Sequence, residues 1–336
     1  MSGGMGDAGS GGMTGWMWMP DDPVSVGGLF AFHPQPVPIL PLLGLAMLLA
    51  YLAGVLLLRR RGDRWPIGRL AWWTLGVLTI ELMTATGFDG YGMELFSVHM
   101  LQHMVLGMLT PILLCLGAPM TLLLRVLPAR PGRSARGLLL RVIHSRFVQF
   151  WANPVTTLVL FLFSLYGLYF TPIFDLLMHS MWGHNLMLIH FLAIGLLYFW
   201  GVLGVDPSPR RGRGLMGAFG RPAMRVVELI VPIPFHAFFG VAIMMASTLV
   251  VRFYADPNPA WHLDPLADQQ VAGGIAWGIT EAPTLLVLGV LITQWQRSDA
   301  RRERGAERRA RRGGDTELDA YNEHLAALAD RDRRVA

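Results

Sequence analysis

Residues 97–119 read SVHMLQHMVLGMLTPILLCLGAP, an apolar run that begins with two histidines, His99 and His103. About 20 apolar residues in a helix span the hydrocarbon core of a bilayer, so this run is long enough to cross a membrane. Ionisable side chains inside a membrane are costly unless they have partners or a task. The run therefore predicts a transmembrane helix that carries a functional site.

The composition of the whole chain excludes an ordinary soluble protein. Only 15% of the 336 residues are charged, 53% are apolar, and the mean hydropathy is +0.43. Seven stretches approach the length of a membrane span, which predicts an all-α, polytopic membrane bundle of seven transmembrane helices. The expected spans are residues 37–58, 70–88, 97–117, 153–171, 183–204, 225–249 and 271–294.

The arginines between the spans predict the orientation in the membrane. The loops 59–69, 130–146 and 210–221 contain five, five and four arginines, whereas the stretches 87–97 and 172–182 contain none. Positive loops remain on the cytoplasmic side, so we expect the N-terminus outside and the C-terminus in the cytoplasm. The net charge of +5 is explained by this arrangement, and nucleic acid is not an expected partner.

Two tails flank the predicted transmembrane domain, which covers residues 37–295. Residues 1–36 are expected to be a flexible extracytoplasmic segment, rich in glycine and methionine, that cannot build a core. It is either a disordered leader or a thioether arm that collects Cu(I), and its donors are Met1, Met5, Met13, Met17, Met19 and His33. Residues 296–336 are expected to be an arginine-rich cytoplasmic tail. The tail ends in a short amphipathic helix with Leu318, Tyr321, Leu325 and Leu328 on one face.

Further ionisable residues on other spans are expected to join His99 and His103. An i, i+4 pair of histidines projects from one helix face, where it can bind one ion or form two successive sites. Six residues turn a helix through about 600°, which leaves His184 and His190 roughly 120° apart. Counted from the span ends, these groups lie in the outer half and middle of the bundle, as a site loaded from outside requires. The expected metal ligands are His99, His103 and His184 in an upper layer and His190 and His236 in a deeper one, with Glu81, Glu281, Met100 and Met104 as supporting groups.

Copper is the expected ion. Imidazole and thioether ligands suit Cu(I), and the single cysteine, Cys115, excludes a thiolate-rich site. Zinc is the alternative, because it accepts the same histidines. Each histidine could instead be a hydrogen-bonded core residue, and each glutamate could pair with a nearby donor.

Three segments carry a family resemblance. They are HMLQHMVLGMLTPILLCLGAP (99–119), HNLMLIHFLAIGLLYFWGVLGVDP (184–207) and DQQVAGGIAWGITEAP (268–283). The chain resembles, over about residues 37–295, the CtaG-type cytochrome c oxidase assembly factors of Gram-positive bacteria. The resemblance implies a multi-pass protein of the bacterial plasma membrane that is not an enzyme. Its expected partners are oxidase subunits in the same membrane, to which it would deliver copper taken from the outer face.

Two other functions stay open at this point. An intramembrane zinc hydrolase would use several histidines and an acidic residue such as Glu281, with an open coordination position at the metal. A b-haem electron carrier would use histidines from facing helices as axial ligands. A transporter is less favoured, since no inverted repeat is evident.

Overall fold

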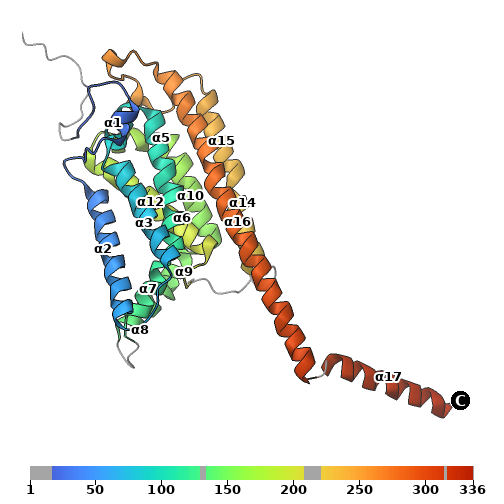
Figure 1. The fold of residues 1–336 in the computed structure, drawn as a ribbon. Coiled ribbons are helices and arrows are strands. Elements are labelled where there is room, and N and C mark those ends of the chain that lie inside the picture. The colour runs from blue at the N-terminus through green and yellow to red at the C-terminus, as the bar shows by residue number, and fades with distance from the viewer. Residues whose placement is uncertain (1–16, 129–133, 208–220, 314–315, 336) are drawn as a thin grey trace, which may run out of the picture. The chain divides into compact units, whose positions relative to one another are not determined.

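We describe the chain from a computed structural model, which gives residues 17–128, 134–207, 221–313 and 316–335. Two compact units are present, Met1–Val287 and Leu288–Ala336. Apart from an isolated bridge between Phe32 and Thr86, the regular structure of these described residues is helical, as predicted (Figure 1).

The first unit is built from helices that mostly run side by side (Figure 1). In chain order its elements are α1 (Val26–Phe30), α2 (Ile39–Arg60), α3 (Ile67–Thr84), α4 (Gly87–Glu94), α5 (Phe96–Met104), the π-helical turn η1 (Val105–Leu109), α6 (Thr110–Leu116), α7 (Pro119–Val126), α8 (Ala135–Ile143), α9 (Arg146–Trp151), α10 (Pro154–Tyr169), α11 (Ile173–Met178), α12 (Met181–Leu203), α14 (Arg221–Ile230), α15 (Pro232–Met245), the short 3-10 turns η2 (Arg252–Tyr254) and η3 (Pro259–Trp261), and the start of α16 (Pro265–Gly313). The second unit contains the rest of α16 and α17 (Thr316–Val335).

Five helical segments in the described part of the chain are long and apolar enough to cross a membrane. The other two predicted spans are also helical, but α10 has only 16 residues, and α3 carries Arg69 and Glu81 within its 18 residues. The chain is thus consistent with a membrane protein, while seven crossings remain a prediction. The five segments are Ile39–Arg60, Phe96–Val126, Met181–Leu203, Met224–Met245 and Pro265–Arg297.

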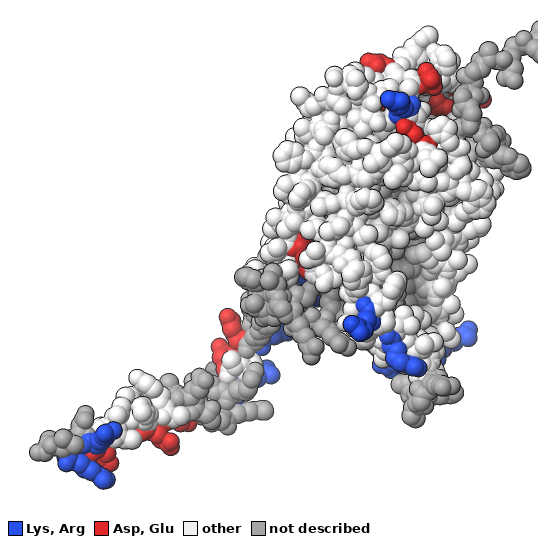
Figure 2. Space-filling view, turned by 180° about the vertical axis from the view of Figure 1, so that it is seen from behind, with Lys and Arg blue, Asp and Glu red and all other residues white. Residues whose placement is uncertain are grey.

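Charge is distributed unevenly along the first unit. On the face drawn in Figure 2, arginines gather at one end, and carboxylates with one basic group gather at the other. This is the asymmetry on which the predicted orientation rests. Residues 129–133 and 208–220, which supply several of the loop arginines, lie outside the described residues. Which end faces the cytoplasm therefore stays a prediction.

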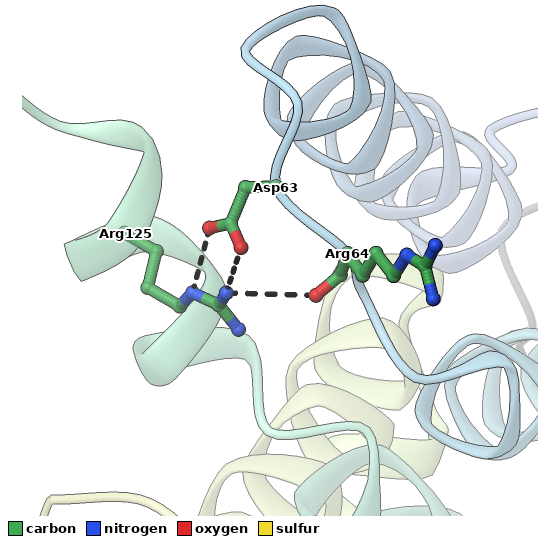
Figure 3. Close-up of polar contacts among 3 residues, drawn as sticks. All are labelled: Asp63, Arg64 and Arg125. Carbon is green, nitrogen blue, oxygen red and sulfur yellow. Dashed lines mark hydrogen bonds and ion pairs between the residues drawn. The ribbon is translucent and has the colours of Figure 1, made fainter.

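The loop between α2 and α3 is attached to the end of α7. Arg125 donates from Nε to Asp63 Oδ2 at 3.1 Å, forms an ion pair with the second carboxylate oxygen, and contacts the Arg64 carbonyl at 3.5 Å (Figure 3). Both partners are about 40% exposed, so the pair contributes at most about 1 kcal/mol. The firmer anchor is the buried Trp65, whose Nε1 donates to the Tyr51 hydroxyl at 3.0 Å.

A distant carboxylate caps α7. Asp206, just beyond α12, accepts hydrogen bonds from the backbone nitrogens of Met120 at 3.0 Å and Thr121 at 2.8 Å. The first backbone N–H groups of a helix have no partner within it, so this carboxylate supplies one. Ala118, with φ of 54°, makes the sharp turn that starts α7. Two of the segments that carry the family resemblance are thereby joined.

A close helix contact in the core lies between η1 and α12. A Cβ atom added at Gly195 would lie 2.2 Å from the carbonyl oxygen of Gly107 and 2.6 Å from Pro111 Cγ. Only glycine at position 195 permits this approach. The contact sets the spacing between the helix that carries His99 and His103 and the helix that carries His184 and His190.

The segment from residue 246 to residue 264 covers one end of these helices. Tyr254 in η2 donates its hydroxyl to the Gly92 carbonyl at 2.8 Å, and the backbone nitrogen of Phe253 donates to Asp175 Oδ1 at 2.9 Å. Both bonds link residues distant in the sequence. The segment is therefore fixed over α4 and α11.

The start of α16 ties the same end together. Asp268 accepts from the backbone nitrogen of Ser97 at 3.2 Å and so caps α5. Gln269 accepts from the backbone nitrogen of Val250 at 2.7 Å, and its amide donates to the Thr248 carbonyl at 3.1 Å. These two adjacent side chains fix α5 and the chain that follows α15 against α16.

The predicted N-terminal segment is described only from residue 17, and Met1, Met5 and Met13 lie outside the described residues. Residues 17–36 contain α1 and pack on the rest of the first unit. The Trp18 ring stacks on His33 at 3.7 Å, and Trp261 Nε1 donates to the Asp21 carbonyl at 2.9 Å. At the other end of the chain, α17 agrees with the predicted tail helix, and its Tyr321, Leu325 and Leu328 are exposed, whereas the Leu318 side chain lies outside the described residues.

Asp89 in α4 is a buried carboxyl group with only amide partners. It is 5% exposed and accepts from Gln102 Nε2 at 2.7 Å. Burial raises the pKa of Asp89 to about 7, although hydrogen bonds from Gln102 and Gln35 oppose the shift.

We predict that replacing Gly195 by alanine loosens the core. The added methyl group must push α12 away from η1, and overpacking of this kind costs about 1–3 kcal/mol. The midpoint of thermal unfolding in detergent should fall by several degrees. Gly274→Ala is the matched control, because nothing lies within 4 Å of a Cβ there. Equal midpoints for both variants would contradict the assigned contact.

We also predict that Asp89 makes stability depend on pH. In the unfolded chain its pKa is about 4, so between about pH 4 and pH 7 the folded state holds a proton that the unfolded state has lost. Stability should therefore fall as the pH rises towards 7 and level off above it. The asparagine in Asp89→Asn is neutral at every pH. In this variant the fall of the unfolding midpoint between pH 5 and pH 8 should therefore be smaller than in the unchanged protein. Parallel curves for the two proteins would disprove the assignment.

Candidate metal-binding site

His99 and His184 lie next to each other in the core. Their ring centroids are 5.9 Å apart with an angle of 45° between the planes. His99 is 0% exposed and His184 is 1% exposed. One comes from α5 and the other from the first turns of α12, where Ser180 caps the helix by accepting from the Gly183 nitrogen at 3.0 Å. The pair thus joins two separate spans, as predicted.

Aromatic side chains enclose His99. The centroid of its ring lies 5.1 Å from Phe174, 6.3 Å from Tyr254 and 6.4 Å from Tyr169. Phe96, at the start of the same helix, stacks on Tyr254 at 5.2 Å. The surroundings of the imidazole are therefore nearly all carbon, and water is kept away from it.

Three ring nitrogens of this pair have no hydrogen-bond partner among the described residues. They are Nδ1 and Nε2 of His99 and Nε2 of His184. Buried polar atoms in folded proteins are nearly always hydrogen-bonded, so each exception needs an explanation. Two imidazole nitrogens that bind one ion at about 2 Å each would place their ring centroids about 6 Å apart. The observed spacing of 5.9 Å fits an ion held between the two rings.

His103 is held in a different way. Its Nδ1 is 2.7 Å from the Tyr169 hydroxyl, and its ring stacks on Phe191 with centroids 3.4 Å apart. The ring therefore faces α10 and α12 one turn below His99. The Tyr169 hydroxyl and the Phe191 ring are thus the partners that the structure gives His103, and the predicted upper layer of three ligand histidines stays a prediction. An i, i+4 pair of histidines can either bind one ion together or form two successive sites. The arrangement of His99 and His103 corresponds to two successive positions.

A small cavity lies beside His103. Its volume is about 20 Å³, and His236 from α15 and the thioether side chains of Met104 and Met108 also line it. A cavity of about 10–15 Å³ holds one water molecule, so this one has room for a single water or ion. His236 thus occupies the deeper position that was predicted, with His103 as its neighbour.

The other predicted groups lie apart from these two positions. His190 is exposed and lies on another side of α12 from His184, as the helical spacing predicts. Its Nε2 is 2.8 Å from Ser164 Oγ. Ser164 is one of the residues that line the small cavity. Glu81 Oε1 faces α2, where a Cβ at Gly44 would lie 2.6 Å from it. Met100 is fully buried but does not line the cavity, and the side chain of Glu281 lies outside the described part of α16.

Within the described residues, no cluster of three or more histidine, cysteine or acidic side chains is placed to hold a metal ion. The two layers predicted from the sequence correspond to separate groups of histidines, because α10, α12 and α15 lie between them, and their role as metal ligands stays a prediction. Sequence reasoning also missed Tyr169, Phe174 and Tyr254, whose aromatic side chains look like ordinary core or loop residues. The only available signal was their presence in segments that flank the histidine spans.

Comparisons with known proteins place the chain among relatives. It is 44% identical over 291 residues to uncharacterized proteins of Mycobacterium bovis and Mycobacterium tuberculosis, and 41% identical over 288 residues to one of Mycobacterium leprae. These alignments cover 84–85% of this chain but only 42–43% of the relatives, so the chain spans less than half their length. No solved structure matches the chain. The cytochrome c oxidase caa3 assembly factor family, Caa3_CtaG, matches residues 49–298, and the chain belongs to that family.

Proposed function

We propose that this protein binds Cu(I) from the outer face of the membrane and delivers it to a cytochrome c oxidase that is being assembled. The family supplies the link to the oxidase. The copper role rests on one observation above all, the three buried ring nitrogens of His99 and His184 that lack hydrogen-bond partners. Without an ion, this pair would leave polar atoms buried among aromatic rings at a cost of several hydrogen bonds.

The number of donors favours Cu(I) over zinc. Zinc sites in proteins usually have three or four protein ligands, and the described residues contain no group of three candidate ligands of the histidine, cysteine or acidic types. Cu(I) accepts two or three ligands, and both imidazole and thioether groups suit it. A pair of histidines in an enclosed apolar environment is therefore a better match to Cu(I).

The small cavity supplies a second position deeper in the bundle. His103 lies one helical turn beyond His99, so the two positions are separated by about 6 Å along α5. His103, His236 and the thioether groups of Met104 and Met108 provide the donor types that suit Cu(I). We infer that the ion moves from the His99–His184 pair to this position before it leaves sideways towards an oxidase subunit.

Neither alternative function gains support from the geometry. A zinc hydrolase needs a metal with three protein ligands and a carboxylate near the bound water. The described residues contain no group of three such ligands, Glu81 faces α2, and the side chain of Glu281 lies outside the described residues. A b-haem electron carrier needs a pocket of several hundred Å³ with histidines from facing helices as axial ligands. The cavity beside His103 and His236 measures about 20 Å³, and a larger cavity of about 640 Å³ has a single histidine, His262, among the described residues that line it. We therefore propose a non-enzymatic role in assembly.

The decisive experiment is an anaerobic titration of the detergent-purified protein with Cu(I) in competition with a chelator. The double variant His99→Ala/His184→Ala should lose the tightest site, with affinity reduced by about 100-fold, because both ligands are removed. The matched control is His144→Ala/His179→Ala, which changes two exposed histidines bonded to backbone carbonyls. Its affinity should equal that of the unchanged protein.

The same variants test the role in assembly. In a bacterium that lacks its own relative of this protein, the unchanged chain should restore oxidase activity, and His99→Ala/His184→Ala should not, at equal protein levels in the membrane. Tight Cu(I) binding that survives the double substitution would refute the proposed site. Full restoration of oxidase activity by that variant would refute the proposed function.

A further inference from the structure

A large cavity opens at the end of the first unit that carries the 246–264 segment. Its volume is about 640 Å³, far larger than the cavity beside His103. It is formed by parts of the chain that are distant in sequence, namely the N-terminal segment, the end of α4 and the loop from η2 to the start of α16. The side chains that matter below are Met19, Met93, Glu94, Tyr254, Asp256 and His262.

The donors that line this cavity change in type from the outside inwards. His262 and Asp256 are exposed, Met19 and Glu94 are partly buried, and Met93 is only 3% exposed. The thioether groups of Met19 and Met93 and the imidazole of His262 are donors that suit a soft monovalent cation. The carboxylates of Glu94 and Asp256 line the same cavity. Both methionines border the same cavity, although Met93 also belongs to the buried core.

The backbone fixes His262 at this wall. Its φ is 48°, a left-handed conformation that residues other than glycine seldom adopt, although histidine and asparagine do so more often than most. It ends the short turn η3, where its nitrogen bonds to the Pro259 carbonyl at 3.4 Å. The imidazole is thus presented from a defined turn.

Tyr254 separates this cavity from the His99–His184 pair. The tyrosine lines the cavity and is 5% exposed, and its ring centroid lies 6.3 Å from that of His99. Its hydroxyl is held by the Gly92 carbonyl, next to Met93. A Cβ at Gly92 would lie only 3.6 Å from the backbone of His99, so the cavity wall and α5 are in contact.

We infer that this cavity is the uptake site for Cu(I), with Met19, Met93 and His262 as its donors and Tyr254 as the gate to His99 and His184. The inference rests on the proposed function, since it names the route by which the ion reaches the histidine pair. The ion keeps its single positive charge throughout, and one set of neutral donors replaces another. Neither electrons nor protons need to be supplied.

The test isolates the outer cavity by removing the inner ligands. The His99→Ala/His184→Ala/Met104→Leu/Met108→Leu protein, which lacks the histidine pair and both thioether groups of the small cavity, is loaded anaerobically with Cu(I) alone. It should keep a weaker site whose X-ray absorption spectrum shows sulfur neighbours. Adding Met19→Leu and Met93→Leu should lower the residual affinity by about tenfold or more and remove the sulfur signal. His262→Asn should weaken it as well, because asparagine tolerates the same backbone conformation but lacks the imidazole.

The matched control replaces two methionines that do not line this cavity, Met47→Leu/Met245→Leu. If this pair removes the sulfur signal, or if Met19→Leu/Met93→Leu leaves it intact, the outer cavity is not the uptake site. Where the histidine variant does not fold, the methionine pairs are compared in the unchanged protein, and the number of bound Cu(I) ions should fall by one only for Met19→Leu/Met93→Leu. Failure of the proposed function looks different, since Cu(I) binding would then be insensitive to His99→Ala/His184→Ala.

Tyr254→Phe tests the gate on its own. The substitution keeps the ring and removes the hydroxyl that bonds to Gly92, so the ring should swing aside more easily. In stopped-flow measurements Cu(I) should load and leave roughly fivefold faster with unchanged affinity. Unchanged rates, or a change in affinity alone, would overturn the role of Tyr254 as a gate.

Discussion

The close approach of Gly195 to the carbonyl of Gly107 is the contact on which the arrangement of the histidines depends. It brings α12 against a π-helical turn that begins at Val105, two residues after His103, at a distance that no residue other than glycine at position 195 would permit. π-Helical turns are uncommon and often occur near functional positions. Because α5 and α12 are held at this distance, His99 meets His184 and His103 meets Phe191.

Polar side chains from distant parts of the chain fix the ends of these helices. Asp268 caps α5, Asp206 caps α7, and Asp175 holds η2. Each carboxylate accepts from backbone N–H groups that have no partner within their own element. These three carboxylates are thus used to join helices, and the proposed Cu(I) sites rest on histidines and methionines.

Much of the helical architecture could be predicted from the sequence, because long apolar runs have few alternatives in a membrane. The pairing of His99 with His184, and the different direction of His190, also follow from helix geometry. The position of His103 could not be predicted, since it depends on the Tyr169 hydroxyl and the Phe191 ring from other helices. The outer cavity was equally hidden, because Met19, Met93 and His262 are separated in the sequence by up to 243 positions and meet only in the folded chain.

The division of the donors into small groups suits transfer better than storage. A single centre of five histidines would bind an ion tightly and release it slowly, since most affinity differences appear in the rate of dissociation. Two histidines at one position, and two histidines with two thioether groups one turn below, give sites of comparable donor strength a short distance apart. On the proposed route, an ion would then move between the two sites without having to leave a site that binds it very tightly. This arrangement supports the proposed transfer from the His99–His184 pair to the position beside His103, and aromatic side chains enclose His99.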